Sequence, residues 1–168
     1  DALPVLSEVM DLGAAAACAE GVGLMRTVLW MTVEYLRTRE QFGAKIGSFQ
    51  ALQHRAVDMF VEAELAKSTG IMAAIKAGDA DPAERAYAIS QAKVQLSVSG
   101  RFVTQQAIQL HGGIGMTEEL AVGHYVKRLT AIDTMFGDAD YHRERFALAG
   151  SIAAEPILAK PRSKWKQI

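Results

Sequence analysis

Apolar residues recur every three or four positions along most of the chain, which is the spacing of amphipathic helices. The first such stretch, from Val5 to Thr38, contains no proline and includes the alanine run 14–17. A helix over this stretch would be about 50 Å long. Gly13, Gly21 and Gly23 interrupt the pattern and weaken the helix. They also leave room for a second backbone or a ligand to come close.

A second helix is expected over residues 49–77, where apolar side chains again recur in steps of three and four. Ser48 comes directly before this stretch and is the expected N-cap, because its hydroxyl can accept from free backbone N–H groups. Gly78 follows the stretch, where a residue in the left-handed conformation often closes a helix. These two residues therefore bound the predicted helix.

A third helix is predicted to begin at Asp81-Pro82 and to end before Gly112-Gly113. The aspartate can cap the helix, and proline suits the first helical position. Glu84 can reach back to complete a capping box. The glycine pair stops the helix, because glycine is a poor helix former.

The periodic stretches in the rest of the sequence are shorter. Two moderate helices are predicted over residues 117–132 and 139–153, separated by Met135-Phe136-Gly137-Asp138. The tail 154–168 has two prolines and four basic residues against one acidic residue, and is expected to be extended or disordered. No strand-like alternation or hairpin signal is found. The chain is therefore predicted to be all-α: an up-down four-helix bundle of long antiparallel helices over residues 1–153, with shorter C-terminal helices.

Composition supports one ordinary globular domain. Of the 168 residues, 50% are apolar and 22% are charged, and the formal net charge of −1 gives no basic excess for nucleic acid. No uninterrupted apolar run is long enough for membrane insertion.

The single cysteine, Cys18, cannot form an internal disulfide and is expected to be a buried packing residue, which favours a reducing compartment such as the cytoplasm. No metal site is predicted, because no glutamate is followed three residues later by the histidine that a di-iron bundle requires.

Two segments contain residues that a plain bundle does not need. Residues 39–50 join two predicted helices and combine Arg39, which can bind a phosphate group through two parallel hydrogen bonds, with glycines that allow close approach. Residues 109–116 begin with Gln109, which offers both a donor and an acceptor, and contain three glycines whose amides suit a phosphorylated or planar ligand. Each segment also has a simpler interpretation: an exposed turn with a helix-end arginine, and a glycine helix stop next to a helix-end His111.

Together, in this order and at this spacing, the motifs resemble the C-terminal helical domain of the acyl-CoA dehydrogenase family over about residues 5–149. They are Arg-x-x-Phe-Gly, a helix that starts with Phe-Gln, and Gln-x-x-Gly-Gly-x-Gly. Arg128 falls near a basic position common in that family. The resemblance implies a flavoenzyme in which the bundle of one subunit contacts the adenosine-diphosphate half of the FAD in its neighbour. By motif, it assigns those contacts to Arg39, Phe42, Phe49, Gln50, Gln109, Leu110, Gly112 and Gly113, and it places Gly137 and Asp138 near the flavin.

The same resemblance shows a gap in the catalytic residues. The family's reaction removes one hydrogen of an acyl-CoA thioester as a proton, which requires a carboxylate base, and the other as a hydride that passes to the flavin. Where most members have that base, this chain has Phe136, and the other family position falls at Gly13. Neither residue can take a proton. Asp11, Asp138 and Asp140 remain as candidates, although the last two also suit helix capping or a hydrogen bond to flavin or ribose.

Three functional interpretations stay open. The chain is the C-terminal domain of a FAD-dependent acyl-CoA dehydrogenase of β-oxidation with a displaced base, inactive as a fragment. Alternatively, it belongs to the base-lacking partner subunit of a hetero-oligomer, or it is a helical oligomerisation module without a ligand. Arg39, Phe42 and the glycine cluster disfavour the module. The resemblance further implies a helical domain and a β-barrel domain ahead of residue 1, a homo- or hetero-oligomer such as a tetramer, and an electron-transfer flavoprotein as electron acceptor.

Overall fold

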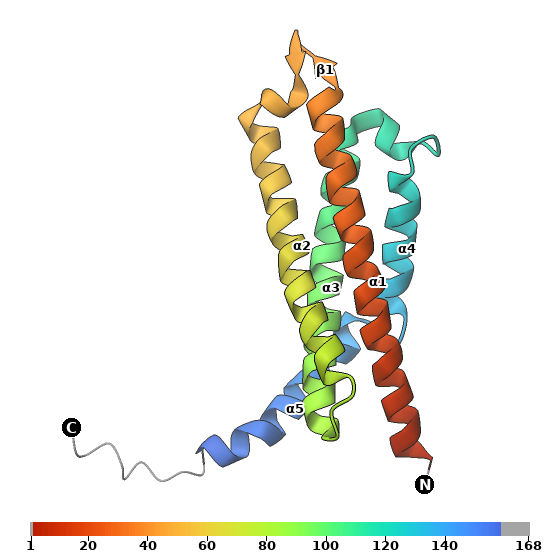
Figure 1. Ribbon diagram of the computed structural model, residues 1–168, viewed down its shortest axis with the longest axis vertical. Helices are drawn as coiled ribbons and strands as arrows, with labels where there is room; N and C mark the ends of the chain where they lie inside the picture. The colour runs from red at the N-terminus through yellow and green to blue at the C-terminus, as the bar shows by residue number, and fades with distance from the viewer. Residues whose placement is uncertain (1, 159–168) are drawn as a thin grey trace, which may run out of the picture.

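Four helices that alternate in direction form the body of the molecule (Figure 1). The computed structural model describes residues 2–158, with side chains through Gly150. Its elements, in chain order, are α1 (Leu3–Thr38), β1 (Glu40–Gln41), β2 (Ala44–Lys45), the 3₁₀ turn η1 (Ile46–Ser48), α2 (Gln50–Lys76), α3 (Pro82–His111), the 3₁₀ turn η2 (Gly112–Met116), α4 (Val122–Thr134) and α5 (Ala139–Leu158). The predicted all-α, up-down bundle is therefore confirmed.

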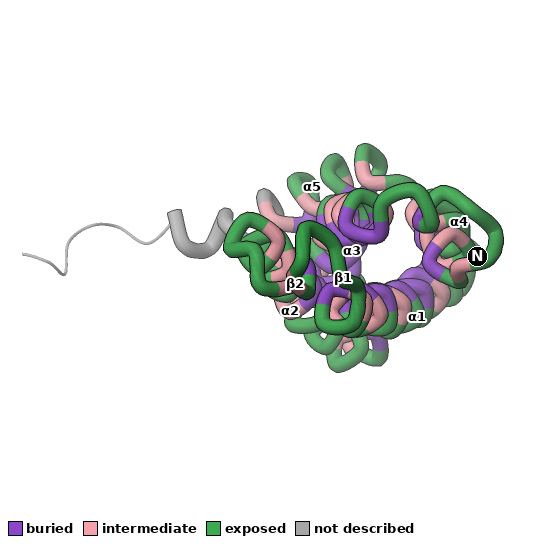
Figure 2. Tube along the Cα trace, turned by 90° about the horizontal axis from the view of Figure 1, so that it is seen from above, coloured by how far each residue is buried: buried purple, intermediate pink, exposed green. Residues whose placement is uncertain are grey.

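The interior of the bundle is built from small and medium apolar side chains on the facing sides of the helices. Figure 2, which looks along the bundle, shows the buried positions turned inward between α1, α2, α3 and α4. Gly21 lets α1 lie close to α3, since a Cβ there would come within 2.6 Å of a methyl group of Leu96. Cys18 is buried, as predicted, and burial raises the pKa of its thiol to about 11. A neutral thiol of this kind acts as a packing residue.

The ends of α2 differ from the sequence prediction. Phe49, not Ser48, occupies the N-cap position, and no side chain caps the helix there. The Ser48 hydroxyl instead donates to the carbonyl of Lys45 at 2.7 Å, because residues 46–48 already form a 3₁₀ turn. Gly78 does not adopt a left-handed conformation, since α2 ends at a right-handed Ala77. Both predicted caps of this helix are therefore wrong.

The start of α3 is as predicted except for the capping box. The Asp81 carboxylate accepts from the N–H of Ala83 at 2.8 Å, and proline takes the first turn. Glu84 does not reach back to Asp81, because the N–H of Asp81 donates to Asp79 instead. Glu84 forms an ion pair with Lys76 at 3.1 Å. The carboxylate thus helps to tie the end of α2 to the start of α3.

A short hairpin follows α1, where no strand was predicted. Strands β1 and β2 pair in antiparallel register, with Glu40 opposite Lys45 and Gln41 opposite Ala44. Phe42 and Gly43 form the turn with φ values of 56° and 77°. Two successive positive φ values are what a two-residue hairpin turn requires. The usual Asn-Gly or Asp-Gly signal is absent, because phenylalanine occupies the first left-handed position.

The C-terminal helices also shift from their predicted bounds. Helix α4 begins at Val122 rather than Thr117, because η2 ends at an extended Thr117 and turns follow it. Helix α5 continues through residues 154–158, where the predicted tail was expected to be extended. The alanines and the glutamate before Pro156 are strong helix formers. The rest of that tail, residues 159–168, lies outside the described part of the chain.

Helix α1 meets a length and mean-hydropathy criterion for a membrane-spanning helix, although Glu20 and Arg26 interrupt its apolar sequence. In its most apolar 18-residue window, 44% of the residues are buried within the bundle. The core helix of a soluble protein passes the same test, and so this observation is weak support for a membrane span.

Candidate functional site

Most of the predicted FAD contacts meet at the hairpin end of the bundle (the upper end in Figure 1). Because the helices alternate in direction, the end of α1, the start of α2 and the end of α3 lie together there. They enclose an open cavity of about 580 Å³. Five of its lining residues were predicted as cofactor contacts: Arg39, Gln109, Leu110, Gly112 and Gly113. The other lining residues are Tyr35, Gln41, Ile46, Leu52, His111 and Ile114.

Arg39 is held by its backbone and free in its side chain. Its N–H donates to the carbonyl of Tyr35 at 2.9 Å, and its own carbonyl accepts from the N–H of Ile46 at 2.9 Å. The side chain is exposed and forms no ion pair or hydrogen bond with any residue whose side chain the structure describes. By contrast, the Arg128 guanidinium binds Glu20 through two hydrogen bonds of 2.6 and 2.8 Å. The backbone thus fixes the position of Arg39 at the edge of the cavity, and its guanidinium is available to an anion.

The other predicted contacts from this segment stand beside the cavity rather than in its wall. Phe42 lies at the tip of the hairpin and is 91% exposed, and its ring meets that of Phe49 edge to face at 6.2 Å. Gln50 is the first residue of α2 and is exposed. An aromatic ring this exposed has a flat face to offer to a planar ligand or to another chain.

The glycine motif forms another part of the cavity wall. Gly112 ends α3 with φ 64° and ψ −141°, and both Gly112 and Gly113 are exposed with nothing within 4 Å of an added Cβ. Their backbone is thus open to a ligand. Leu110 is buried in the core, and His111 is packed against Tyr35 with its ring N–H donating to the carbonyl of Ala107 at 2.8 Å. His111 is therefore a helix-end packing residue, as predicted.

Gly137 and Asp138 lie at the other end of the bundle, in the turn between α4 and α5. There the ring of Phe136 covers Gly13 on α1: a Cβ added to this glycine would come within 2.4 Å of the ring. Gly13 and Arg39 are about 39 Å apart along α1, at 1.5 Å per residue. The structure therefore separates the predicted cofactor contacts into two groups, and it brings the two family base positions, Gly13 and Phe136, into contact.

This second end contains a smaller cavity of about 200 Å³ between the start of α1 and the start of α5. Leu3, Leu6 and Met10 line it on one side. Phe136 and Asp11 are also in its wall. Asp11 was the candidate base on α1, but its carboxylate is only 2% exposed.

Each of the three candidate carboxylates already has a structural partner. Asp11 pairs with Arg145 at 2.6 Å and with Arg85 at 3.6 Å. Asp138 accepts from the N–H of Tyr141 at 2.9 Å and so caps α5. Asp140 forms an ion pair with Arg143 on the next turn. These contacts agree with the capping interpretation for Asp138 and give no support to a free base.

His142, which no sequence signal marked, lies buried beside the same turn. Its Nε2–H donates to the carbonyl of Phe136 at 3.0 Å, and its Nδ1 accepts from the Ser90 hydroxyl at 3.1 Å. Burial is the main reason that its pKa falls to about 4. The imidazole is therefore neutral at pH 7, and with Nε2 carrying its proton, Nδ1 is the acceptor.

This lowered pKa predicts a loss of stability in acid. The unfolded chain takes up the proton near pH 6.5 and the folded chain only near pH 4, and so the stability supplied by neutral His142 is complete above pH 6.5 and is lost as the pH falls toward 4. We expect the free energy of unfolding from urea titrations to fall over this window. The fall should be smaller in the His142→Gln variant, whose side chain does not titrate. An equal fall in both proteins would contradict the assignment.

One contact elsewhere completes the description of the site residues. Arg128 pairs with Glu20 and so ties α4 to α1, and its hydrogen bond lowers the pKa of the Glu20 carboxyl. Among the described side chains, those of residues 2–150, no three histidine, cysteine, aspartate or glutamate residues gather as metal ligands would.

Comparisons with known proteins agree with these motifs. The model of the acyl-CoA dehydrogenase C-terminal domain matches residues 3–150. The chain is 38% identical to the acyl-CoA dehydrogenase IpdE2 of Mycobacterium tuberculosis (strain ATCC 25618 / H37Rv) over 122 residues, which are 71% of this chain and 36% of that protein. Two solved structures have the same fold. The Tcur3481-Tcur3483 steroid ACAD G363A variant has a TM-score of 0.82 at 29% identity, covering 89% of this chain and 41% of that one. PigA with FAD and proline has a TM-score of 0.77 at 26% identity, covering 86% and 37%. The chain thus spans well under half the length of the proteins that it matches.

Proposed function

Because this chain belongs to the acyl-CoA dehydrogenase family, of which it is a C-terminal domain, we propose that it holds part of a FAD shared between two subunits of a longer enzyme. That enzyme carries out the α,β-dehydrogenation of an acyl-CoA thioester, as in β-oxidation. When bound, FAD supplies the hydride acceptor. The residues of this chain hold, orient and enclose the cofactor.

One observation carries the proposal: an unpaired arginine and an exposed glycine backbone face the same cavity. The Arg39 guanidinium suits a pyrophosphate, because its planar fork donates two parallel hydrogen bonds to phosphate oxygens. Gly112 and Gly113, in the wall of the same cavity, allow a ligand to touch the backbone. The exposed ring of Phe42 is placed to stack on a planar group such as adenine. A bundle with only a structural role needs none of these features.

The separation of the two groups of contacts supports sharing between subunits. The ring of Phe136, in the turn at Gly137, covers Gly13 on α1. Gly13 lies about 39 Å from Arg39 along this helix, and a single FAD does not span that distance. The chain therefore contacts two FAD molecules, one at each end. The hairpin end completes the FAD of a neighbour, and the turn at Gly137 faces the flavin of its own subunit.

The outer surface of α2 and of the middle of α1 supports association with other subunits. A groove of about 200 Å³ between the two helices is lined by Trp30, Val57 and Phe60. Further along α2, Ile71 and Ile75 are more than half exposed. Exposed apolar surface of this extent is typical of an interface. We propose an oligomer, with an electron-transfer flavoprotein as the external electron acceptor.

A second candidate function is a base-lacking subunit of a hetero-oligomer. The contacts at the turn favour it, because Phe136 occupies the family base position and Asp11, Asp138 and Asp140 are each engaged elsewhere. The steroid ACAD among the structural neighbours is itself named for two proteins, Tcur3481 and Tcur3483. In this arrangement the chain completes the FAD site of a partner subunit that has the base.

Flavin content tests the proposal directly. The isolated 168-residue chain is expected to purify without stoichiometric FAD, because it offers only part of the cofactor site and must bear the full entropic cost of binding. The full-length protein, alone or co-expressed with its partner, is expected to contain FAD and to run as an oligomer in sedimentation analysis. Stoichiometric flavin on the isolated chain, or none on the full-length oligomer, would contradict a shared site.

A further inference from the structure

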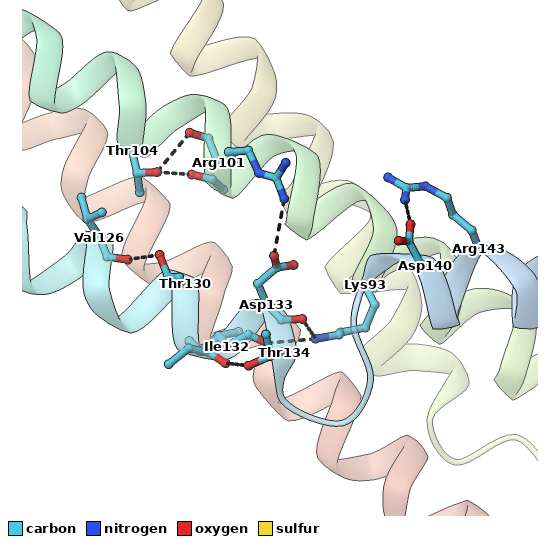
Figure 3. Close-up of polar contacts among 12 residues, drawn as sticks. Lys93, Arg101, Thr104, Val126, Thr130, Ile132, Asp133, Thr134, Asp140 and Arg143 are labelled. Carbon is cyan, nitrogen blue, oxygen red and sulfur yellow. Dashed lines mark hydrogen bonds and ion pairs between the residues drawn. The ribbon is translucent and has the colours of Figure 1, made fainter.

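A charged side chain is buried under the turn between α4 and α5 and binds only backbone. Lys93 on α3 is 1% exposed. Its ammonium donates to the carbonyls of Ile132 at 2.9 Å, Asp133 at 3.2 Å and Met135 at 2.8 Å. Figure 3 shows Lys93 reaching across from α3 to the last residues of α4. All three donors of the ammonium are thus used on the end of one helix and the turn that follows it.

The charge of Lys93 suits this place. The last carbonyls of a helix have no partner within the helix and carry its partial negative charge, so a cation stabilises them. Burial lowers the pKa of the Lys93 ammonium. A buried lysine is costly, and here all three of its donors bind the end of α4 and Met135, the first residue of the turn.

His142 on α5 holds the next residue of the turn. Its Nε2–H donates to the carbonyl of Phe136, while the Ser90 hydroxyl, on the same helix as Lys93 and one turn earlier, donates to its Nδ1. The imidazole is 1% exposed. The carbonyls of Met135 and Phe136 are therefore both fixed from the protein interior, by two side chains on different helices.

The turn that they hold is in a conformation that it would not adopt freely. Phe136 has φ 59° and Gly137 has φ 102°. A left-handed phenylalanine is sterically unfavourable, and it persists only where surrounding contacts fix it. Such residues cluster at functional sites. The conformation presses the Phe136 ring onto Gly13, and it packs Gly137 so closely against the ring of Tyr141 that an added Cβ would clash with it.

We infer that Lys93 and His142 are positioning residues that fix the turn 135–138 against the flavin of the same subunit. This inference rests on the proposed function for the identity of the ligand, and on the contacts above for the turn itself. Neither side chain touches the cofactor. They act through Met135 and Phe136, whose carbonyls they hold.

The test uses the FAD-loaded full-length oligomer with Lys93→Met, which keeps the length of the side chain and removes its donors. Two variants separate the role of His142: His142→Gln retains an N–H donor, and His142→Leu does not. Met59→Ala is the control, because Met59 is fully buried in α2, away from the turn, and its truncation lowers the melting temperature by opening a cavity. The readouts are the visible spectrum of the bound flavin, the amide exchange of Met135 and His142, and the melting temperature.

Lys93→Met and His142→Leu are expected to raise amide exchange at the turn about tenfold or more, the effect of losing hydrogen bonds to a buried donor, and to shift the flavin spectrum. His142→Gln should restore most of the slow amide exchange at the turn and of the original flavin spectrum. Met59→Ala should change neither the exchange at the turn nor the flavin spectrum, although it lowers the melting temperature by the same amount. Faster exchange with an unchanged flavin spectrum would reduce the two residues to a purely structural role and overturn the inference. Unchanged exchange at the turn would overturn it as well. A full-length oligomer without FAD would instead refute the proposed function, whatever the exchange data show.

Discussion

Replacing Arg39 with alanine is expected to release flavin from the full-length oligomer while its helices stay folded. The guanidinium is exposed, has no partner among the described side chains and faces the cavity that Gly112 and Gly113 line. Loss of a charge-assisted contact to a desolvated pyrophosphate costs about 2–5 kcal/mol. Affinity for FAD should therefore fall by more than about tenfold. The measurement is the flavin-to-protein ratio after dialysis, with circular dichroism as the check on folding.

Two matched variants show whether the guanidinium itself is responsible. Arg39→Lys keeps the charge but lacks the planar fork, and so it should restore flavin only in part. Glu40→Ala changes the next exposed residue, in β1, and should leave the flavin content unchanged. Full retention of FAD by Arg39→Ala would make this segment a simple helix-end turn and remove the main support for a pyrophosphate site.

Replacing Asp11 with asparagine is expected to destabilise the protein strongly without a specific effect on flavin reduction. Asp11 is 2% exposed and forms ion pairs with both the buried Arg85 and Arg145. Removing one partner of a buried ion pair leaves the other charge uncompensated, which costs about 3–5 kcal/mol. Urea unfolding of the full-length protein measures this loss. The rate of flavin reduction by acyl-CoA, expressed per folded flavin, should stay unchanged.

Glu20→Gln is the control for Asp11→Asn. Glu20 forms the same type of carboxylate–guanidinium pair with Arg128, but both side chains are more than 40% exposed. Its loss should affect stability far less, because exposed pairs contribute little. If Asp11→Asn abolished flavin reduction in a protein of normal stability, Asp11 would be the displaced base and the chain would belong to a catalytic subunit.

The helices could be predicted from the sequence because their apolar positions follow one period over long stretches. Asp81-Pro82 and Gly112-Gly113 also marked the bounds of α3, since the Asp81 carboxylate caps the helix locally and Gly112 ends it with a positive φ. The hairpin could not be predicted. Its turn places Phe42 in a left-handed conformation that intrinsic preferences disfavour, and contacts formed only in the fold, such as the ring of Phe49, lie beside it.

The site could be predicted only in part, for the same reason. The motif residues Arg39, Gln109, Gly112 and Gly113 lie around one cavity because the alternation of the helices brings the two loops together. Nothing in the sequence marked Lys93 or His142, since a buried lysine and a neutral buried histidine depend on partners about 40 and 6 residues away. The separation of Gly137 from Arg39 likewise depends on a contact formed only in the fold, that of Phe136 with Gly13.

A structure of the full-length oligomer with bound FAD tests the central claim most directly, through the position of Arg39 relative to the cofactor. We expect the Arg39 guanidinium to lie within hydrogen-bonding distance, about 2.7–3.0 Å, of the pyrophosphate of a FAD whose flavin ring belongs to a neighbouring subunit. The turn at Gly137 should face a different FAD molecule. A FAD whose pyrophosphate is bound entirely within one subunit, with Arg39 in solvent, would contradict the account.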